Sequence, residues 1–126
     1  MEELYRFREF YFRYQNADAE TLRHLNFSLY SGDFALLCGA SGSGKTTLLR
    51  IMKPEIRPAG WRSGKALFSS DSFRIGYVGQ NPEDQIVTDK VWHELAFGLE
   101  NLGLPSETIH RKVAEMCQFF GMEDWY

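Results

Sequence analysis

The chain has 126 residues, of which 44% are hydrophobic and 25% are charged. This composition excludes disordered and fibrous proteins and predicts one small globular domain. The net charge is −3, from 14 Lys and Arg residues and 17 Asp and Glu residues, and it offers no basic footprint for DNA or RNA. The sequence has no long apolar run and no apolar segment behind a basic N-terminus, so we expect neither a membrane span nor a secretion signal.

The two cysteines bear on the cellular compartment. Cys38 falls in a stretch that is predicted to be a buried strand, and Cys117 falls in a predicted helix. We expect both to be reduced thiols that pack in the interior, as is usual in the cytosol, and we favour this over a disulfide between them.

The first forty residues predict three strands. Aromatic residues alternate with charged ones over residues 4–14, which is the period of a strand with one buried face. After a polar turn, residues 21–30 alternate again, and residues 31–33 turn the chain once more. The apolar run at residues 34–38 is predicted to be a third, buried strand that follows two antiparallel ones.

A short helix and two further strands are predicted next. The helix spans Lys45–Met52, and it ends at Lys53 because the proline that follows disfavours helical geometry there. Residues 54–64 are predicted to be a loop, and residues 65–68 and 73–78 to be short strands rich in apolar side chains.

Two amphipathic helices are predicted in the last third of the chain. The first has Thr88 as its N-cap and ends at Gly103, and the second is capped by Ser106 and ends at Gly121. Their apolar stripes consist of Val91, Leu95, Leu99 and Leu102 in the first helix and of Ile109, Val113, Met116 and Phe120 in the second.

Together these elements predict an α/β fold with antiparallel N-terminal strands and parallel-sheet character. Parallel sheets need crossover connections and helices on both faces. A nucleotide-binding fold that begins in this way is usually longer, so we expect the sheet of residues 1–126 to be incomplete, with an exposed edge.

A glycine-rich motif between the buried strand and the short helix indicates the chemistry. The pattern G-x-x-x-x-G-K-[ST] is matched by Gly39, Ala40, Ser41, Gly42, Ser43, Gly44, Lys45 and Thr46. The glycines let the backbone curl so that several N–H groups point at one phosphate, and the next helix presents its positive end there. Lys45 then reaches the β- and γ-phosphates, and the Thr46 hydroxyl can bind Mg²⁺. The motif predicts a phosphate loop rather than a flexible Gly/Ser segment.

Other polar residues are predicted to have ordinary roles. His93 and Glu94 begin the zinc motif H-E-x-x-H, but Phe97 stands where the second histidine is needed. The acidic residues near the middle of the chain could bind a cation, although a solvated loop is the favoured interpretation. These residues are Glu83, Asp84 and Asp89.

The sequence shows no carboxylate suited to hydrolysis. Phosphate-loop enzymes usually carry an Asp at the end of an apolar strand, where it helps to hold Mg²⁺. No Asp or Glu after Lys45 follows four apolar residues, and the nearest case, Asp89, follows only two and then Thr88. We therefore predict that residues 1–126 bind phosphate but do not hold all the residues that hydrolysis needs.

Three stretches together carry a resemblance to a known family. They are F-R-Y at residues 12–14, the glycine-rich motif, and Y-V-G-Q-N-P-E-D-Q-I-V-T-D at residues 77–89, which leads to E-L-A-F-G-L-E-N-L-G at residues 94–103. The chain resembles the P-loop NTPases of the ATP-binding cassette type, specifically the ATPase subunits of energy-coupling factor vitamin transporters, of the thiamine-precursor or cobalt type. The resemblance spans residues 1–126 but corresponds only to the first half of such an ATPase.

The resemblance implies a role for each site residue. Tyr14 would stack on adenine, and the loop, with Thr47 added, would hold the phosphates of ATP. Gln80 would approach Mg²⁺ and the attacking water, so that Lys45 and Gln80 take part in catalysis while Thr46 and Gln80 contact the metal. Residues 81–89 would be both a nucleotide sensor and a docking surface.

The resemblance also implies partners. The family's L-S-G-G-Q signature, Walker B aspartate, catalytic glutamate and switch histidine are not found in residues 1–126. Family ATPases hold ATP between two subunits, which implies a second ATP-binding subunit, a membrane-embedded coupling subunit and a place on the cytoplasmic face of the cell membrane. Hydrolysis by this chain alone is expected to be close to nil.

Two alternatives stay open at this point. A small phosphate-loop kinase would share the glycine-rich motif but would need an acceptor site and basic lid residues. A nucleotide-binding interaction module would bind ATP without hydrolysing it. The stretch at residues 77–89 argues against the kinase, whereas ATP binding without hydrolysis, together with capture by a membrane coupling subunit, would favour the interaction module.

Overall fold

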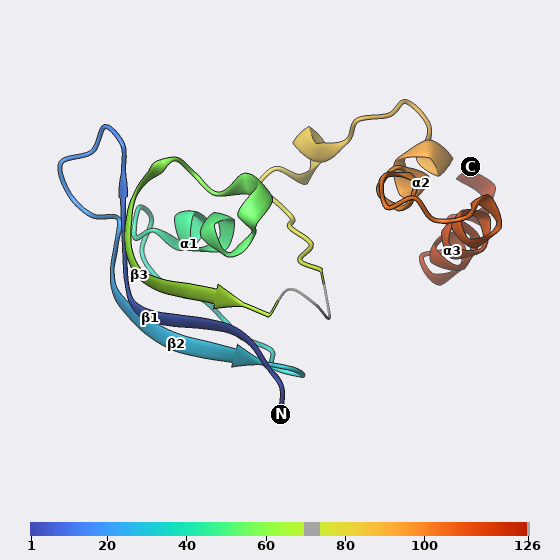
Figure 1. Ribbon diagram of the computed structural model, residues 1–126. Coiled ribbons are helices and arrows are strands. Elements are labelled where there is room, and N and C mark those ends of the chain that lie inside the picture. Colours follow the sequence, from blue (N-terminus) through green and yellow to red (C-terminus); the bar gives the residue numbers. More distant parts are fainter. Residues whose placement is uncertain (70–73, 126) are drawn as a thin grey trace. The chain divides into compact units, whose positions relative to one another are not determined.

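The computed structural model describes residues 1–69 and 74–125. They divide into a sheet unit, Met1–Tyr77, and a helical unit, Val78–Tyr126, and each unit has its own cluster of buried side chains. The predicted α/β fold with antiparallel N-terminal strands is confirmed (Figure 1). Within the described ranges, no helix is long and apolar enough to cross a membrane.

The sheet unit contains three antiparallel strands in the order β2-β1-β3. The central strand β1 (Glu3–Tyr14) pairs with β2 (Leu22–Tyr30) on one side and with β3 (Gly60–Phe68) on the other. Both strands predicted from the first thirty residues are confirmed. One face of β1 presents four aromatic side chains that are at most 3% exposed: Tyr5, Phe7, Phe10 and Phe12.

The alternation of β1 is interrupted at Glu9, whose backbone φ is 45°. The register with both neighbouring strands shifts here, so that Phe7 and Phe10 face the core although they are three positions apart. On β3 the bulge meets Gly64, whose φ is 80° and whose added β-carbon would collide with the Glu9 carbonyl. The sheet is curved, and helix α1 (Lys45–Met52) lies on its concave side (Figure 1).

Helix α1 packs on the aromatic face of the sheet. Leu48 and Ile51 are buried in one cluster with the aromatic side chains of β1. The last turn of α1 is held by Arg57, whose Nε donates to the Ile51 carbonyl (2.6 Å) and whose Nη2 donates to the Tyr5 hydroxyl (3.0 Å). The guanidinium thus satisfies a carbonyl at the negative end of the helix and ties that end to β1.

The predicted buried strand at residues 34–38 is wrong. These residues form neither strand nor helix, Phe34 is 98% exposed and Leu36 is 83% exposed. A parallel strand becomes buried only when strands pair with it and helices cover it, and no described strand pairs with this stretch. Both cysteines are free thiols, but Cys38 is exposed whereas Cys117 is buried. The packing role predicted for the thiols is therefore correct only for Cys117.

Strand β3 begins earlier than predicted. Residues 54–64 were expected to be a loop, but they contain a 3₁₀ turn at Pro54–Ile56 and the first residues of β3. The further strand predicted at residues 73–78 is not formed by residues 74–78, and Phe73 lies outside the described residues. The prediction that α1 ends at Lys53, just before a proline, is confirmed, because Lys53 has extended geometry.

The helical unit consists of two packed helices, α2 (Val91–Asn101) and α3 (Ser106–Phe119). Both predicted helices are confirmed, with shifted starts: α2 begins three residues after Thr88, and the N-cap position of α3 is taken by the proline before Ser106. The buried residues of the unit are Ala96, Ile109, Val113 and Cys117.

The apolar stripe of α3 differs from the predicted one in its last turns. Cys117 is fully buried, whereas Met116 is 45% exposed and Phe120 is 62% exposed. Ile109, Val113 and Cys117 are spaced by four residues and so lie along one line of the helix. That line, rather than one through Met116, faces α2.

We predict that Arg57→Gln lowers the free energy of unfolding of the sheet unit by about 1–2 kcal/mol, because hydrogen bonds to a charged group are lost at a helix end. Urea denaturation followed by circular dichroism measures this change. Arg62→Gln is the matched control, since Arg62 is an exposed cation on β3, and we expect it to change stability by less than about 0.5 kcal/mol. Equal stability of the two variants would contradict the role of Arg57.

Candidate nucleotide-binding site

The glycine-rich loop forms a tight curl ahead of α1. Gly42 and Gly44 have φ values of 79° and 99°, a region that glycine enters without steric cost. The Ser43 N–H donates to the Ala40 carbonyl (3.1 Å), and the Leu48 N–H donates to the Gly44 carbonyl (2.9 Å) as the first bond of α1. The loop therefore leads directly into the helix, as the motif predicts.

Two glycines of the loop are also closely packed, Gly39 against a side chain that can rotate and Gly44 against its neighbours' backbone and side chains. A β-carbon on Gly39 would lie 2.6 Å from the Ser43 Oγ. A β-carbon on Gly44 would lie 3.0 Å from the Leu22 side chain and 3.1 Å from the Thr21 carbonyl. Gly44 thus brings the start of α1 against the start of β2.

The Lys45 side chain folds back across the loop. Its Nζ donates to the carbonyl oxygens of Gly39 and of Ala40 (2.8 Å) and to the Ser43 Oγ (3.3 Å). The ammonium is thereby held at the mouth of the curl that the backbone forms. If a phosphate bound in that curl, the Lys45 ammonium would donate its hydrogen bonds to phosphate oxygens instead of to these loop oxygens.

The N-terminus of α1 is available to an anion. No side chain caps it and no acidic residue lies in its first turn, so the N–H groups of that turn and the helix dipole act toward the loop. Thr46, at the second position of the helix, is exposed, and its hydroxyl is the kind of oxygen ligand that Mg²⁺ accepts. These donors fit a polyphosphate and its metal ion.

Tyr14 reaches the same helix from the end of β1. Its hydroxyl shares a 2.7 Å hydrogen bond with the Oγ1 of Thr47, and its ring packs edge-on against Phe12, with ring centroids 5.0 Å apart. Thr47 is 7% exposed, so the bond fixes a half-buried aromatic ring one turn from the phosphate loop. The sheet unit therefore brings Tyr14, Lys45, Thr46 and Thr47 to one end of α1.

Gln80 lies in the other unit. It is exposed at a bend just before the 3₁₀ turn Pro82–Gln85. Its neighbour Gly79 donates its N–H to the Gln85 side chain (3.1 Å), which closes the segment on itself. The catalytic and metal roles of Gln80 stay predictions.

Glu94 holds the segment that follows Gln80. One carboxylate oxygen of Glu94 accepts hydrogen bonds from the Val87 N–H (3.1 Å), the Thr88 N–H (2.9 Å) and the Thr88 hydroxyl (3.0 Å). The bond from the Thr88 N–H, with smaller contributions from the other two, lowers the pKa of Glu94 below its ordinary value. Val87, which is 61% exposed, is thus fixed on the surface by a carboxylate on α2.

Sequence reasoning did not identify the Tyr14–Thr47 bond or the role of Glu94. The N-cap role predicted for Thr88 is wrong, because the N-cap position of α2 is taken by Lys90 and the Thr88 hydroxyl donates instead to Glu94, six residues further on. A carboxylate in the first turn of a predicted helix, shortly after a Ser or Thr, is the signal that could have indicated it.

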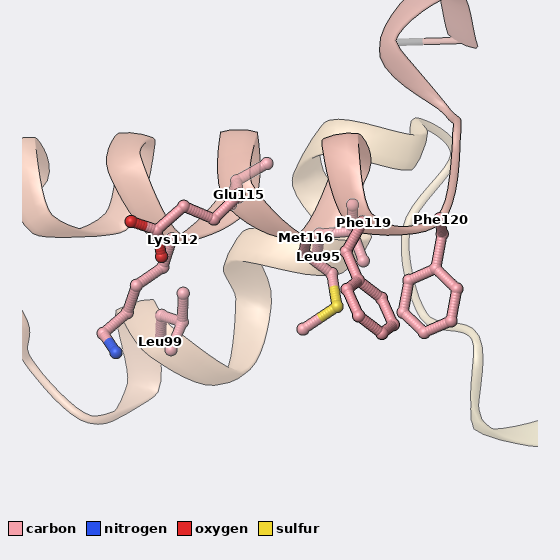
Figure 2. A pocket seen from close by; sticks show the side chains of 8 residues that line it. Leu95, Leu99, Lys112, Glu115, Met116, Phe119 and Phe120 are labelled. Carbon is pink, nitrogen blue, oxygen red and sulfur yellow. The ribbon is translucent and has the colours of Figure 1, made fainter.

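A hollow with a volume of about 670 Å³ lies between α2 and α3, away from the glycine-rich loop in the sequence. Figure 2 shows the lining side chains, which are Leu95 and Leu99 of α2, Met116 and Phe119 of α3, and Phe120, which directly follows α3. Only Lys112 and Glu115 add charge. The groove is apolar and offers no set of N–H donors, so it does not resemble a phosphate site.

Apart from the glycine-rich loop and α1, we looked for metal-binding groups among the described residues. They contain no group of three or more His, Cys, Asp or Glu side chains that could hold a metal ion. The arrangement at α1 gathers an ammonium group, an uncapped helix N-terminus and a half-buried aromatic ring.

Comparisons with known proteins identify relatives of this chain. The family model described as ABC transporter matches residues 22–125. A putative ABC transporter ATP-binding protein of Bacillus cereus is 42% identical over 123 residues, which cover 90% of this chain and 22% of that protein. A cobalt import ATP-binding protein, CbiO, of Syntrophus aciditrophicus is 36% identical over 126 residues, covering 94% of this chain and 45% of the relative.

A solved structure matches as well. It is cbiO1 from Clostridium perfringens, described as part of the ABC transporter complex cbiONQ, with a TM-score of 0.77 and 25% sequence identity. The match covers 99% of this chain and 53% of that one. The chain thus spans about half, or less, of the length of the proteins that it matches.

We predict that the protection of the Val87 and Thr88 amides against hydrogen exchange depends on pH through Glu94. Because the folded pKa of Glu94 is lowered, its contribution is complete above the unfolded pKa of about 4.3 and is lost as the pH falls through the folded pKa. Exchange detected by NMR, corrected for intrinsic rates, measures this dependence.

Two variants test the assignment. Glu94→Gln is expected to remove the acid-dependent loss of protection, because its side chain does not titrate. Glu100→Gln, on the exposed side of the same helix, is expected to keep the wild-type profile. Unchanged acid dependence in Glu94→Gln would show that another group controls these amides.

Proposed function

Because the chain belongs to the ABC transporter family of ATP-binding domains, we propose that it binds Mg-ATP as the N-terminal part of a transporter ATPase subunit. The observation that carries this proposal is the cluster of groups suited to a phosphate at the start of α1. Lys45 Nζ lies on the loop carbonyls, the helix end has no acidic neighbour, and an aromatic ring is fixed beside it.

In this proposal each group has one task. The N–H groups of residues 39–47 bind the phosphates, Lys45 neutralises their charge, and Tyr14 stacks on the adenine ring. Thr46 would hold Mg²⁺, which supplies positive charge between the β- and γ-phosphates. Gln80 would contact the metal ion and the attacking water.

Within the family, we propose the energy-coupling factor type. The support is the 36% identity to a protein named as a cobalt import ATP-binding protein and the fold match to cbiO1. The parent would then energise uptake of a vitamin-like solute or a metal ion. Binding rather than turnover is proposed for residues 1–126, since the carboxylate that activates water is not evident among them.

The proposed partners follow from the same relatives. We propose a membrane-embedded coupling subunit and a second ATP-binding subunit, with the protein peripheral on the cytoplasmic face of the membrane. The segment at residues 81–89 is the proposed docking surface, because Glu94 holds it and two of its apolar side chains are exposed. These are Ile86, at 60%, and Val87, at 61%.

We predict that Lys45→Ala abolishes ATP binding, because the variant lacks the cation that faces the phosphates. Isothermal titration calorimetry with Mg-ATP measures the affinity. Lys112→Ala, which removes an equal charge from α3 in the helical unit, serves as the control and is expected to bind as the wild type does. Equal affinity of Lys45→Ala and wild type would overturn the assignment of the loop.

We predict that Tyr14→Ala weakens ATP binding by roughly 5- to 150-fold, since stacking of a base on an aromatic ring contributes about 1–3 kcal/mol. Binding of inorganic tripolyphosphate, which has no base, is expected to be unchanged. Tyr14→Phe keeps the ring and loses only the bond to Thr47, so most of the ATP affinity is expected to remain. Equal losses for ATP and tripolyphosphate in Tyr14→Ala would argue against stacking.

A further inference from the structure

The convex face of the sheet, opposite to α1, carries a row of basic side chains. Residues of β1 that alternate with the buried aromatics lie on this face, and their partners on β3 share it because cross-strand neighbours point the same way. The register pairs Arg6 with Leu67, Arg8 with Lys65 and Arg13 with Trp61. We call these six residues the basic face.

The central pair of the basic face is unusual. Arg8 and Lys65 stand directly opposite each other, and both are exposed. Like charges in this position destabilise a sheet. Neither side chain forms an ion pair with a described residue, and the nearby Glu9 carboxylate is engaged by His24 (2.8 Å) and Asn26 (2.8 Å). The pair therefore leaves two cations without a counter-ion among the residues that the structure describes.

Apolar side chains flank these cations. Trp61 is 66% exposed and has the Arg13 guanidinium 5.9 Å from its ring centroid, and Leu67 is 52% exposed. Exposed Trp beside basic residues is the combination found where proteins meet the headgroup region of a membrane. An acidic peptide or a free anion would not require the apolar members of the row.

Charge is also distributed unevenly along the chain. Residues 1–77 hold 11 Lys and Arg against 8 Asp and Glu, whereas residues 78–126 hold 3 against 9. An anionic surface therefore attracts the sheet unit and repels the helical unit. The overall charge of −3 conceals this local basic character.

We propose that the basic face lies against anionic phospholipid headgroups. This inference rests on the proposed function in one respect, namely that the protein works at a membrane. Arg8 and Lys65 contact lipid phosphates and Arg13 adds to the field, whereas Arg6 is already paired with the Glu3 carboxylate (2.7 Å) and adds little net charge. Trp61 and Leu67 lie at the level of the headgroups. The lipid phosphates relieve the repulsion across the Arg8–Lys65 pair.

Cosedimentation of the 126-residue chain with vesicles tests the proposal. Wild type is expected to bind vesicles of equal parts phosphatidylglycerol and phosphatidylcholine, and not vesicles of phosphatidylcholine alone. The double variant Arg8→Gln/Lys65→Gln is expected to lose about 25-fold in partitioning, because each basic residue near an anionic surface contributes about fivefold. Trp61→Ala alone is expected to bind vesicles more weakly than wild type. Its salt dependence is expected to be that of wild type, because no charge is removed.

The control is Arg111→Gln/Lys112→Gln, which removes the same charge from α3 and is expected to retain wild-type partitioning. An equal loss in both double variants would show that net charge alone matters and would overturn the proposal, as would no loss in Arg8→Gln/Lys65→Gln. Release of wild type by inorganic phosphate, beyond the effect of chloride at equal ionic strength, would indicate a discrete anion site instead and would also overturn it.

Two further measurements separate this proposal from others. Thermal unfolding of Arg8→Gln/Lys65→Gln is expected at or above the wild-type temperature, since a repulsive pair is removed, which excludes loss of binding by misfolding. ATP affinity of the same variant is expected to be unchanged. A wild type that binds vesicles but not ATP would contradict the proposed function alone, and one that binds ATP but not anionic vesicles would contradict the basic face alone.

Discussion

The packing of α1 on the aromatic row of β1 is the contact on which the rest of the sheet unit depends. Phe12 and Ile51 are fully buried in it, and burial of side chains of this size contributes about 2–3 kcal/mol each. Polar contacts fix the helix at both ends, through Tyr14 and Thr47 near its start and through Arg57 near its finish. Since the phosphate loop runs directly into α1, the position of the loop is set by a hydrophobic contact rather than by the loop itself.

The strands that could be predicted are those whose partners lie nearby in the sequence. The alternation over residues 4–14 and 21–30 reports one buried face, and the two strands are joined by a short turn, so local pattern and pairing agree. Residues 34–38 show the limit of this reasoning, because an apolar run reports only that burial would be favourable. Burial requires neighbouring strands. The sequence pattern of one strand does not show whether the fold provides such neighbours.

Other errors have local causes. The start of β3 reads as a loop because Gly60 and Gly64 interrupt the apolar pattern, yet both glycines are needed where β3 meets β1: a β-carbon on Gly60 would lie 2.8 Å from the Phe12 ring. In the candidate site the conformation of residues 39–46 could be predicted because glycine spacing and the following helix are local features. The Tyr14–Thr47 bond joins residues 33 positions apart, and no local pattern indicates it.

The hydrogen bonds of Lys45 have a consequence for selectivity. Three loop oxygens already accept hydrogen bonds from its ammonium. The binding free energy that an anion gains from Lys45 is therefore only the difference between its own interaction with the ammonium and that of the loop oxygens. A singly charged anion such as chloride or acetate replaces these neutral acceptors with one charged group, which strengthens the interaction by a single charge. A chain of phosphates offers several negative oxygens at once and strengthens the interaction further. In the proposed site, the loop would therefore discriminate among anions by charge density, before any contact with a base is made.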